Sequence, residues 1–257
     1  MGNVRLQPAG RSRRRRPATP SAGHLIPGGA LVAFFFAILI VGCATTSRGP
    51  FASPSDSSPS GSQHVDSPEP APVEEQRLGA TQKQVVDAAE DLVGRQNLEI
   101  NGRRFPFDCT GTILAAYYAA GIDLQAEFDR YTGNGVARLY KLSEDADLVY
   151  KQDTPRPGDV IFWDNTYDRN GDGRWNDSLT HAGIVIRGYE DGSVDYVHHD
   201  YNRGVVVARM NIDEPDVHTS DDTLVNSPMR MRRDRHIKPS QWLAGHLYRS
   251  GAELYRL

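Results

Sequence analysis

The chain contains very little cysteine: among its 257 residues, only Cys43 and Cys109 carry a thiol. A framework of several disulfides, which stabilises many small exported domains, is therefore excluded. Beyond the first 42 residues, basic residues are outnumbered by acidic ones. Six arginines and no acidic residue precede Cys43, which leaves 23 Lys and Arg against 33 Asp and Glu in the rest of the chain. A body this acidic argues against nucleic acid as a partner, because neutralising phosphates requires clustered Lys and Arg.

The longest apolar run is too short for a comfortable membrane span. It covers residues 31–41 and follows four consecutive arginines at 13–16. A basic region followed by a short apolar one is typical of a secretory signal. The alternative interpretation is an uncleaved anchor, or a plain signal with a chance cysteine.

The run ends in Ile-Val-Gly-Cys at residues 40–43, which resembles a lipobox. The resemblance implies a signal peptide at 1–42 and a lipid, including palmitate, on Cys43. Ala44 is not Asp, and by similarity to sorted lipoproteins this implies the periplasmic face of the outer membrane. Residues 43–79 are mostly rich in Ser, Pro and Gly, which predicts a disordered tether. If Cys43 is acylated, Cys109 is an unpaired thiol in an oxidising setting, which is a liability unless the thiol is buried or used.

Residues 80–257 are predicted to form one folded domain. A capping box at 81–84 and an apolar stripe from Val85 to Val93 predict one helix, and a second is expected from Cys109 to Ala120. Segments 159–163, 182–186, 193–198 and 204–208 are predicted strands. Helices followed by hairpin-connected strands predict an α+β fold, with N-terminal helices packed on an antiparallel sheet. The stretch 123–154 yields no assignment.

A cysteine in the first turn of a helix suggests nucleophilic chemistry. Free backbone N–H groups and the helix dipole favour the thiolate, so we expect a lowered pKa for Cys109. The small residues Thr110 and Gly111 are expected to leave room for a substrate. A thiol nucleophile also needs a base and a group that orients the base. His181 opens a predicted strand, and His198 lies on the next, whereas His199 should face the other way because strand neighbours alternate.

Four segments together resemble the NlpC-type cell-wall peptidases and the related CHAP amidases. They are Phe-Asp-Cys-Thr-Gly at 107–111, Pro-Gly-Asp-Val-Ile-Phe-Trp at 157–163, Thr-His-Ala-Gly-Ile-Val-Ile at 180–186 and Tyr-Val-His-His at 196–199. The resemblance covers about residues 80–210. It departs from the family pattern in the Thr at 110, in a longer segment before the first His, and in the two adjacent histidines.

The resemblance implies a papain-like fold and a catalytic triad of Cys109, His181 and His198, with no cofactor for catalysis. It also implies peptidoglycan as the substrate. The expected bond is the D-Glu–diaminopimelate link of the stem peptide or the muramoyl–L-Ala amide. Two other hypotheses stay open. One is a non-catalytic envelope lipoprotein that binds peptidoglycan or regulates a wall hydrolase, and the other is acyl transfer by the same triad.

The insertion at residues 164–179 resembles the opening of a calcium loop. The candidate oxygen ligands are Asp168, Asn170, Asp172, Asn176 and Asp177. Gly173 stands at position six, but position twelve is Leu179 instead of the expected Glu. The alternative is a hairpin tip rich in turn-forming residues. A structural Ca²⁺ here would rigidify the loop that precedes His181.

Overall fold

The computed structural model describes residues 78–151 and 153–257. The predicted signal peptide, Cys43 and the tether up to residue 77 lie outside the described residues. Within the described ranges, no helix is long and apolar enough to cross a membrane. The helices are α1 (Ala80–Asp91), α2 (Cys109–Ala119), α3 (Gly135–Asp145), α4 (Ala244–Leu247) and the 3₁₀ segments η1 (Leu124–Arg130), η2 (Arg232–Asp234) and η3 (Leu254–Arg256). The strands are β1 (Leu98–Ile100), β2 (Arg103–Phe105), β3 (Val149–Tyr150), β4 (Val160–Trp163), β5 (His181–Gly188), β6 (Val194–Asp200), β7 (Gly204–Met210), β8 (Thr219–Ser220), β9 (Thr223–Leu224) and β10 (Tyr248–Ala252).

The central feature is a six-stranded sheet in the order β3-β10-β4-β5-β6-β7, and every neighbouring pair in it is antiparallel. The four strands predicted from the sequence are the consecutive strands β4 to β7. The prediction of an α+β fold with an antiparallel sheet is therefore confirmed. β10 adds a strand from the end of the chain, between β3 and β4.

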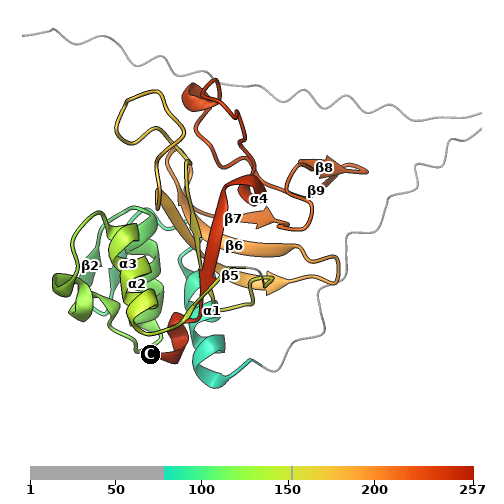
Figure 1. The fold of residues 1–257 in the computed structure, drawn as a ribbon. Helices are drawn as coiled ribbons and strands as arrows, with labels where there is room; N and C mark the ends of the chain where they lie inside the picture. The colour runs from blue at the N-terminus through green and yellow to red at the C-terminus, as the bar shows by residue number, and fades with distance from the viewer. Residues whose placement is uncertain (1–77, 152) are drawn as a thin grey trace, which may run out of the picture. The chain divides into compact units, whose positions relative to one another are not determined.

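The sheet has two apolar faces because its side chains alternate. On β4, Val160 and Phe162 join the core formed with α1, α2 and α3, whereas Ile161 and Trp163 join a second core. Figure 1 shows α2 and α3 together on one side of the strands. Burial on both faces explains why β4 is a continuous apolar run.

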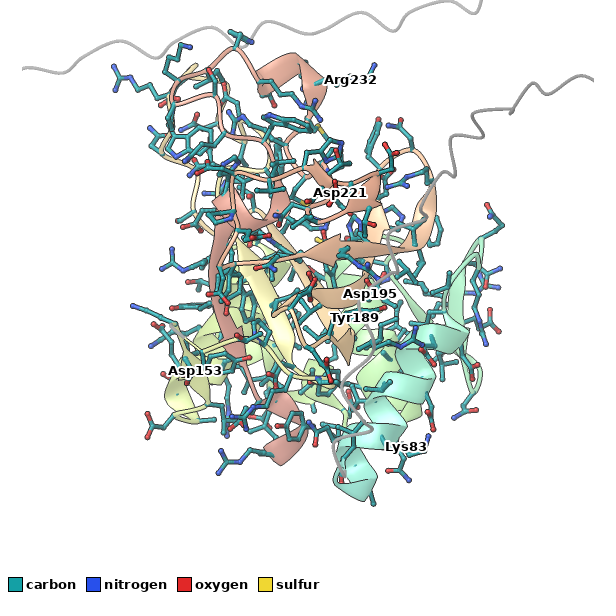
Figure 2. The ribbon with its side chains drawn as sticks, turned by 90° about the vertical axis from the view of Figure 1, so that its right-hand side faces the viewer. Lys83, Asp153, Tyr189, Asp195, Asp221 and Arg232 are labelled. Atoms are coloured by element: carbon teal, nitrogen blue, oxygen red, sulfur yellow. The ribbon has the colours of Figure 1, made fainter. Side chains whose placement is uncertain are left out.

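The second face is covered by the segment that follows β7. Ala244 and Leu247 of α4 pack there against Trp163 and Tyr196. Figure 2 shows Lys83 of α1 and Arg232 of this C-terminal segment at opposite ends of the described chain.

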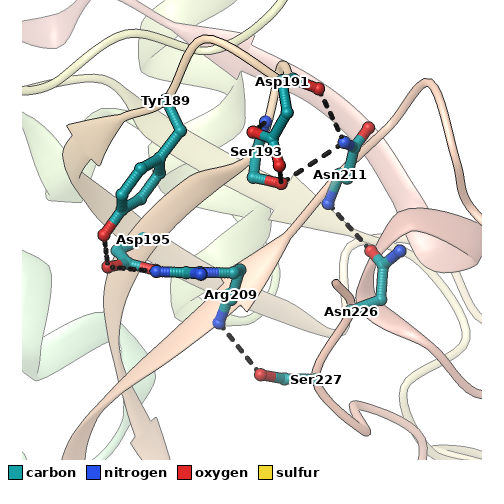
Figure 3. Close-up of polar contacts among 8 residues, drawn as sticks. All are labelled: Tyr189, Asp191, Ser193, Asp195, Arg209, Asn211, Asn226 and Ser227. Carbon is teal, nitrogen blue, oxygen red and sulfur yellow. Dashed lines mark hydrogen bonds and ion pairs between the residues drawn. The ribbon is translucent and has the colours of Figure 1, made fainter. Parts of the chain in front are cut away.

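Hydrogen bonds attach this segment to β7, as Figure 3 shows. Ser227 Oγ accepts from the Arg209 amide at 2.9 Å, and Asn226 Oδ1 accepts from the Asn211 amide at 2.9 Å. Beside them, the Arg209 guanidinium is paired with the Asp195 carboxylate at 2.8 Å, and the Tyr189 hydroxyl donates to the same carboxylate. The two bonds from the Arg209 and Asn211 amides use backbone groups at the edge of the sheet that would otherwise be free to pair with other chains.

The structure differs from the sequence-based expectation at two places. The first helix begins at Ala80, so the capping box predicted at 81–84 is wrong. Gln82, not Gln84, bonds the Gly79 amide through Oε1, and its Nε2 donates to the Pro157 carbonyl. That contact with a residue distant in sequence fixes the start of the helix. The stretch 123–154, which had no assignment, holds η1, α3 and β3.

Candidate active site

Cys109 is the first residue of α2, as the sequence predicted. Asp108 precedes the helix in an extended conformation, and its carboxylate accepts from the Gly111 amide at 2.7 Å. The Asp108 carbonyl accepts from the Thr112 amide at 3.0 Å. These bonds leave the backbone N–H groups of the helix start at Cys109 and Thr110 without partners within the helix.

The pKa of the Cys109 thiol is raised to about 11, which contradicts the expected lowering. Desolvation by burial is the largest cause, and the negative charge of Asp108 adds to it. The backbone N–H groups of Ala182 and Thr110 favour the thiolate, but with the Thr110 side chain they only partly offset the rise. The same Asp108 that caps the helix therefore places a negative charge beside the sulfur.

The small residues next to Cys109 have a structural role that differs from the expected one. Thr110 and Gly111 are buried, so they do not leave room for a substrate. A Cβ on Gly111 would lie 1.8 Å from the Pro106 carbonyl oxygen, and one on Gly135 would lie 2.4 Å from Thr110 Oγ1. Glycine is needed at 111 because the chain entering the helix passes directly against it.

His181 and His198 are brought together by the pairing of β5 with β6. His181 Nε2 and His198 Nδ1 lie 2.9 Å apart, with the two rings nearly perpendicular at 84°. The rings of Trp163 and Tyr196 lie against the pair from the second core. His198 is only 4% exposed, so its orientation is set by packing as well as by the hydrogen bond.

Both imidazoles favour the neutral form. Burial lowers the pKa of His181 to about 4, with a smaller contribution from His199, whereas Asp200 opposes the shift. Burial also lowers the pKa of His198 well below its usual range, and the neighbouring His181 adds to this. A neutral imidazole has one donor and one acceptor nitrogen. If His181 Nε2–H donates to His198 Nδ1, His181 Nδ1 is left as a free acceptor.

Among the residues described, Cys109 and His181 form no hydrogen bond with each other, and the part of β5 that reaches the sulfur is the backbone next to His181. The Ala182 amide, whose N–H is directed at the Cys109 sulfur, is the residue next to His181. β5 packs against α2 through Ala182, Ile184 and Ile186 in the first core, and these side chains alternate along the strand with His181, whose ring lies against Trp163 of the second core. Cys109 is half-buried and is the one free cysteine of the described chain.

His199 faces away from this pair, as alternation along the strand requires. Its ring makes an edge-to-face contact with Phe107, with 4.6 Å between ring centroids and an angle of 87°. Its Nε2 is buried without a hydrogen-bond partner. Geometrically, His198 is therefore the histidine that bonds to His181.

The insertion at 164–179 forms a loop whose side chains bond its own backbone. Asp168 accepts from the amides of Gly171 and Gly173, and Asn170 accepts from that of Asp172. Asp172 also accepts from the Asn176 side chain at 2.9 Å.

Asp177 differs from the exposed Asn170 and Asp172 in being buried. It is 1% exposed, and neither of its carboxylate oxygens has a hydrogen-bond partner. Its negative charge favours the protonated forms of Arg230 and Tyr167, because it acts to raise the pKa of each. In the described ranges, no three or more His, Cys, Asp or Glu side chains come together as a metal-binding group. The structure therefore does not gather Asp168, Asp172 and Asp177 into such a group.

Sequence reasoning missed the role of Arg230 and the position of Tyr167. Arg230 is 2% exposed, its guanidinium lies 4.5 Å from the Trp175 ring centroid, and it donates to the carbonyls of Asn165 and Asp234. It thereby holds the insertion to the C-terminal segment. Tyr167 lies close enough to Cys109 for a thiolate charge to raise its pKa. The only sequence signal for either was an aromatic residue in a polar loop and an arginine in a basic run.

Comparison with known proteins adds no relative: no family model matches the chain, and no curated protein is significantly similar to it.

Proposed function

We propose that this chain is a peptidoglycan hydrolase of papain-like fold, with Cys109 as nucleophile, His181 as base and His198 as the residue that orients His181. The observation that carries the proposal is the 2.9 Å contact between His181 Nε2 and His198 Nδ1. It supports the proposal because, when His181 Nε2–H donates to His198, His181 Nδ1 is an acceptor for the thiol proton, while Cys109 begins a helix and its sulfur accepts from the amide of the residue after His181. A nucleophile, a base and an orienting group are the three parts that covalent acyl transfer requires.

The proposed reaction begins from neutral partners. Since the thiol pKa is raised and the His181 pKa is lowered, the thiol proton moves to His181 Nδ1 as the sulfur attacks the substrate carbonyl carbon. The carbonyl oxygen becomes an oxyanion, for which the Cys109 backbone N–H is a candidate donor. The oxyanion then collapses, the C–N bond breaks, and the His181 imidazolium gives its proton to the leaving amine. Water, deprotonated by His181, then cleaves the thioester and restores the thiol.

His198 acts through His181 in this scheme. Its Nδ1 accepts from His181 Nε2–H, which fixes the tautomer of the base and its ring orientation. When His181 becomes an imidazolium, the same hydrogen bond becomes charge-assisted and therefore stronger. Asp200 lies within electrostatic range of both rings and favours the protonated form of each.

The substrate class comes from the family resemblance of the four sequence segments. The proposed bond is either the D-Glu–diaminopimelate link or the muramoyl–L-Ala amide. The proposal includes a lipid on Cys43 that holds the domain at the periplasmic face of the outer membrane. Peptidoglycan stem peptides and the membrane lipid are then its partners, and nucleic acid is not.

We also propose a structural Ca²⁺ in the insertion. The donor set of Asp168, Asn170 and Asp172 consists of the carboxylate and amide oxygens that Ca²⁺ prefers, and Asn170 and Asp172 are exposed while Asp168 is half-buried. Asn176 and Asp177 are the other candidate ligands; the Asp177 carboxylate is buried with neither oxygen hydrogen-bonded, and like Asp168 it lies within electrostatic range of Arg230. Thermal melts of the full chain in CaCl₂ and in EDTA test the site. A midpoint that is higher with calcium is expected, and equal midpoints would contradict it.

The test of the enzyme is digestion of purified sacculi, followed by mass spectrometry of the released muropeptides. The wild-type chain is expected to release products whose masses identify the bond, and Cys109→Ala is expected to release none. Cys109→Ser is a matched variant that keeps a small hydroxyl at the same helix start. Equal products from wild type and Cys109→Ala would rule the enzyme out.

A second candidate function is a non-catalytic envelope protein that binds peptidoglycan or regulates a wall hydrolase. The raised thiol pKa favours it, because a thiol that resists ionisation is a weak nucleophile. Sedimentation with sacculi separates the two candidates. Binding by wild type and by Cys109→Ala, with no product from either, would support the binding protein.

A further inference from the structure

Basic residues are concentrated in the segment that covers the second face of the sheet. Residues 229–242, which we call the basic loop, contain five Arg and Lys and one Asp. The rest of residues 78–257 contains 16 Arg and Lys against 27 Asp and Glu. The loop is therefore a local concentration of positive charge on an acidic domain, and the catalytic scheme gives it no role.

Two arginines of the basic loop hold its own structure together. Arg230 is 2% exposed, and its Nε–H donates to the Asp234 carbonyl at 2.9 Å. The Arg235 guanidinium lies 4.3 Å from the Trp242 ring centroid, and its Nε–H donates to the Arg230 carbonyl at 3.1 Å. The Arg230 amide donates to the Trp242 carbonyl at 3.0 Å and closes the base of the loop. A loop fixed in this way loses little further freedom when a partner binds.

The other three cations of the loop, Arg232, Arg233 and Lys238, are exposed. Within residues 78–151 and 153–257, the side chains of Arg232 and Lys238 form no hydrogen bond or ion pair. Arg233 makes a long contact of 3.6 Å with Asp234, through the same carboxylate oxygen that accepts from the Asp168 amide. The fold does not neutralise these three charges, so they are available to an anionic partner.

Hydrogen bonds join the basic loop to the neck of the insertion, beside the candidate base. The Met231 amide donates to the Thr166 carbonyl at 2.8 Å. Thr166 bonds Thr180 Oγ1 through its own amide and hydroxyl, at 3.0 and 2.9 Å. Thr180 immediately precedes His181 in the chain. The loop and the start of β5 therefore lie at the same end of the sheet.

An extended polyanion fits these charges better than a small anion. One exposed cation binds one carboxylate weakly, because water screens the pair, whereas several pairs to one polymer act together. Figure 2 shows Arg232 at one end of the described chain, where a large surface can reach it. In the cell envelope, the polyanionic surfaces are the peptidoglycan and the anionic membrane. Because the loop is bonded to the neck beside His181, docking on the wall would bring the site to its substrate, whereas docking on lipid would turn the site away from it.

We propose that the basic loop is a docking surface for peptidoglycan, on which Arg232, Arg233 and Lys238 pair with the free carboxylates of the stem peptides. The choice of this polymer rests on the proposed hydrolase function. The loop binds the polymer outside the bond that is cut, so it adds affinity for the intact wall and takes no part in the chemistry.

The experiment measures sedimentation of the full chain with purified sacculi in the Cys109→Ala background, in which the wall is not cleaved. Into this background we place a basic-loop variant, Arg232→Gln with Arg233→Gln and Lys238→Gln. Each exposed pair contributes about 1.4- to 5-fold to a binding constant, so losing all three should weaken binding about 3- to 150-fold. Binding by the parent should also weaken from about 20 mM to about 300 mM NaCl, because salt screens exposed charges.

The matched control removes the same number of positive charges from exposed positions outside the loop. It carries Lys83→Gln, Arg104→Gln and Lys141→Gln, whose side chains are paired with Asp87, Glu99 and Asp145. Its net charge equals that of the basic-loop variant, so a general effect of charge should weaken both equally. Thermal melts should give both variants midpoints close to that of the parent, because the substituted side chains are exposed.

A second arm replaces sacculi with vesicles of equal parts phosphatidylglycerol and phosphatidylcholine. Loss of sacculus binding in the basic-loop variant alone, with weaker binding of the parent to vesicles, supports the proposal. Equal binding by the basic-loop variant and the control overturns it, and so does the absence of parent binding at low salt. Loop-dependent binding to vesicles at or above the affinity for sacculi assigns the loop to the membrane and also overturns it.

The hydrolase is judged separately, by the muropeptides that the chain with Cys109 intact releases. Loop-dependent binding to sacculi without any release would overturn the hydrolase and leave the docking surface in place. Release that depends on Cys109, with binding that does not depend on the loop, would do the reverse.

Discussion

Replacing His198 with Ala tests the candidate site most directly. The change removes the only hydrogen-bond partner of His181 Nε2 among the residues described, at a contact of 2.9 Å. It also removes ring contacts with His181 and Tyr196. His199→Ala is the natural control, because it removes an adjacent imidazole from the same strand that contacts Phe107 instead.

The expected size of the effect follows from the hydrogen bond. Leaving a buried polar group without its partner costs about 1–3 kcal/mol. The hydrogen bond to His198 is strongest when His181 is an imidazolium. We therefore expect its loss to raise the free energy of the transition state more than that of the ground state. Since about 1.4 kcal/mol corresponds to a factor of ten in rate, kcat should fall roughly 5- to 150-fold in His198→Ala.

His199→Ala should lose stability instead of activity. An aromatic edge contact contributes about 0.5–1.5 kcal/mol, and its loss would lower the midpoint of unfolding. His198→Asn is a useful third variant, because its amide oxygen can accept a hydrogen bond in place of Nδ1. It should recover part of the activity lost in His198→Ala.

The assay is the initial rate of muropeptide cleavage, measured well below the melting transition of the least stable variant. The reasoning would be refuted if His198→Ala and His199→Ala lost activity equally, or if His198→Ala stayed within threefold of wild type. Either result would mean that the hydrogen bond does not orient a catalytic base.

Three further predictions concern the helix start and the sheet. Iodoacetamide should alkylate Cys109 with a rate that keeps rising above pH 9, because the thiol pKa is raised to about 11; a plateau below pH 7 would show a stabilised thiolate instead. Burial raises the pKa of Asp159 from 3.8 to about 6, so its contribution to stability is full below pH 4 and is lost as pH rises through 6. Urea unfolding should therefore show Asp159→Asn gaining up to roughly 3 kcal/mol relative to wild type between pH 4 and 7.5, and a pH-independent difference would contradict the shift. The melting midpoint of Gly111→Ala should lie far below that of Gly188→Ala. A Cβ at 111 overlaps the Pro106 carbonyl, whereas nothing lies within 4 Å of a Cβ at 188. Similar midpoints would show that the backbone at Pro106, which leads into α2, moves aside freely.

Much of the framework was predictable from local patterns. Pro106 and Asp108 specify where α2 begins, since proline blocks a preceding helix and aspartate caps the next. Alternating and continuous apolar runs identified β4 to β7. Strand alternation also separates His198 from His199, because neighbours on a strand face opposite sides of the sheet. These signals act over a few residues, so the sequence alone contains them.

The properties of the thiol were not predictable in this way. A helix start favours the thiolate, but the pKa of Cys109 is raised because burial and the charge of Asp108 outweigh the backbone amides. Burial depends on how α2 lies against β5, which no local pattern specifies. The small size of Gly111 was similarly misread as space for a substrate, whereas it accommodates the Pro106 backbone.

The sequence by itself determined the first two helices, strands β4 to β7 and the order of the chemical groups: a cysteine at a helix start, then two strand-borne histidines. Tertiary structure decided which groups lie near the sulfur and how they ionise. The Ala182 amide reaches the Cys109 sulfur only because β5 packs against α2, and these two elements are far apart in the sequence. Local patterns come from backbone geometry and side-chain periodicity, whereas proximity and desolvation arise only when distant segments pack together.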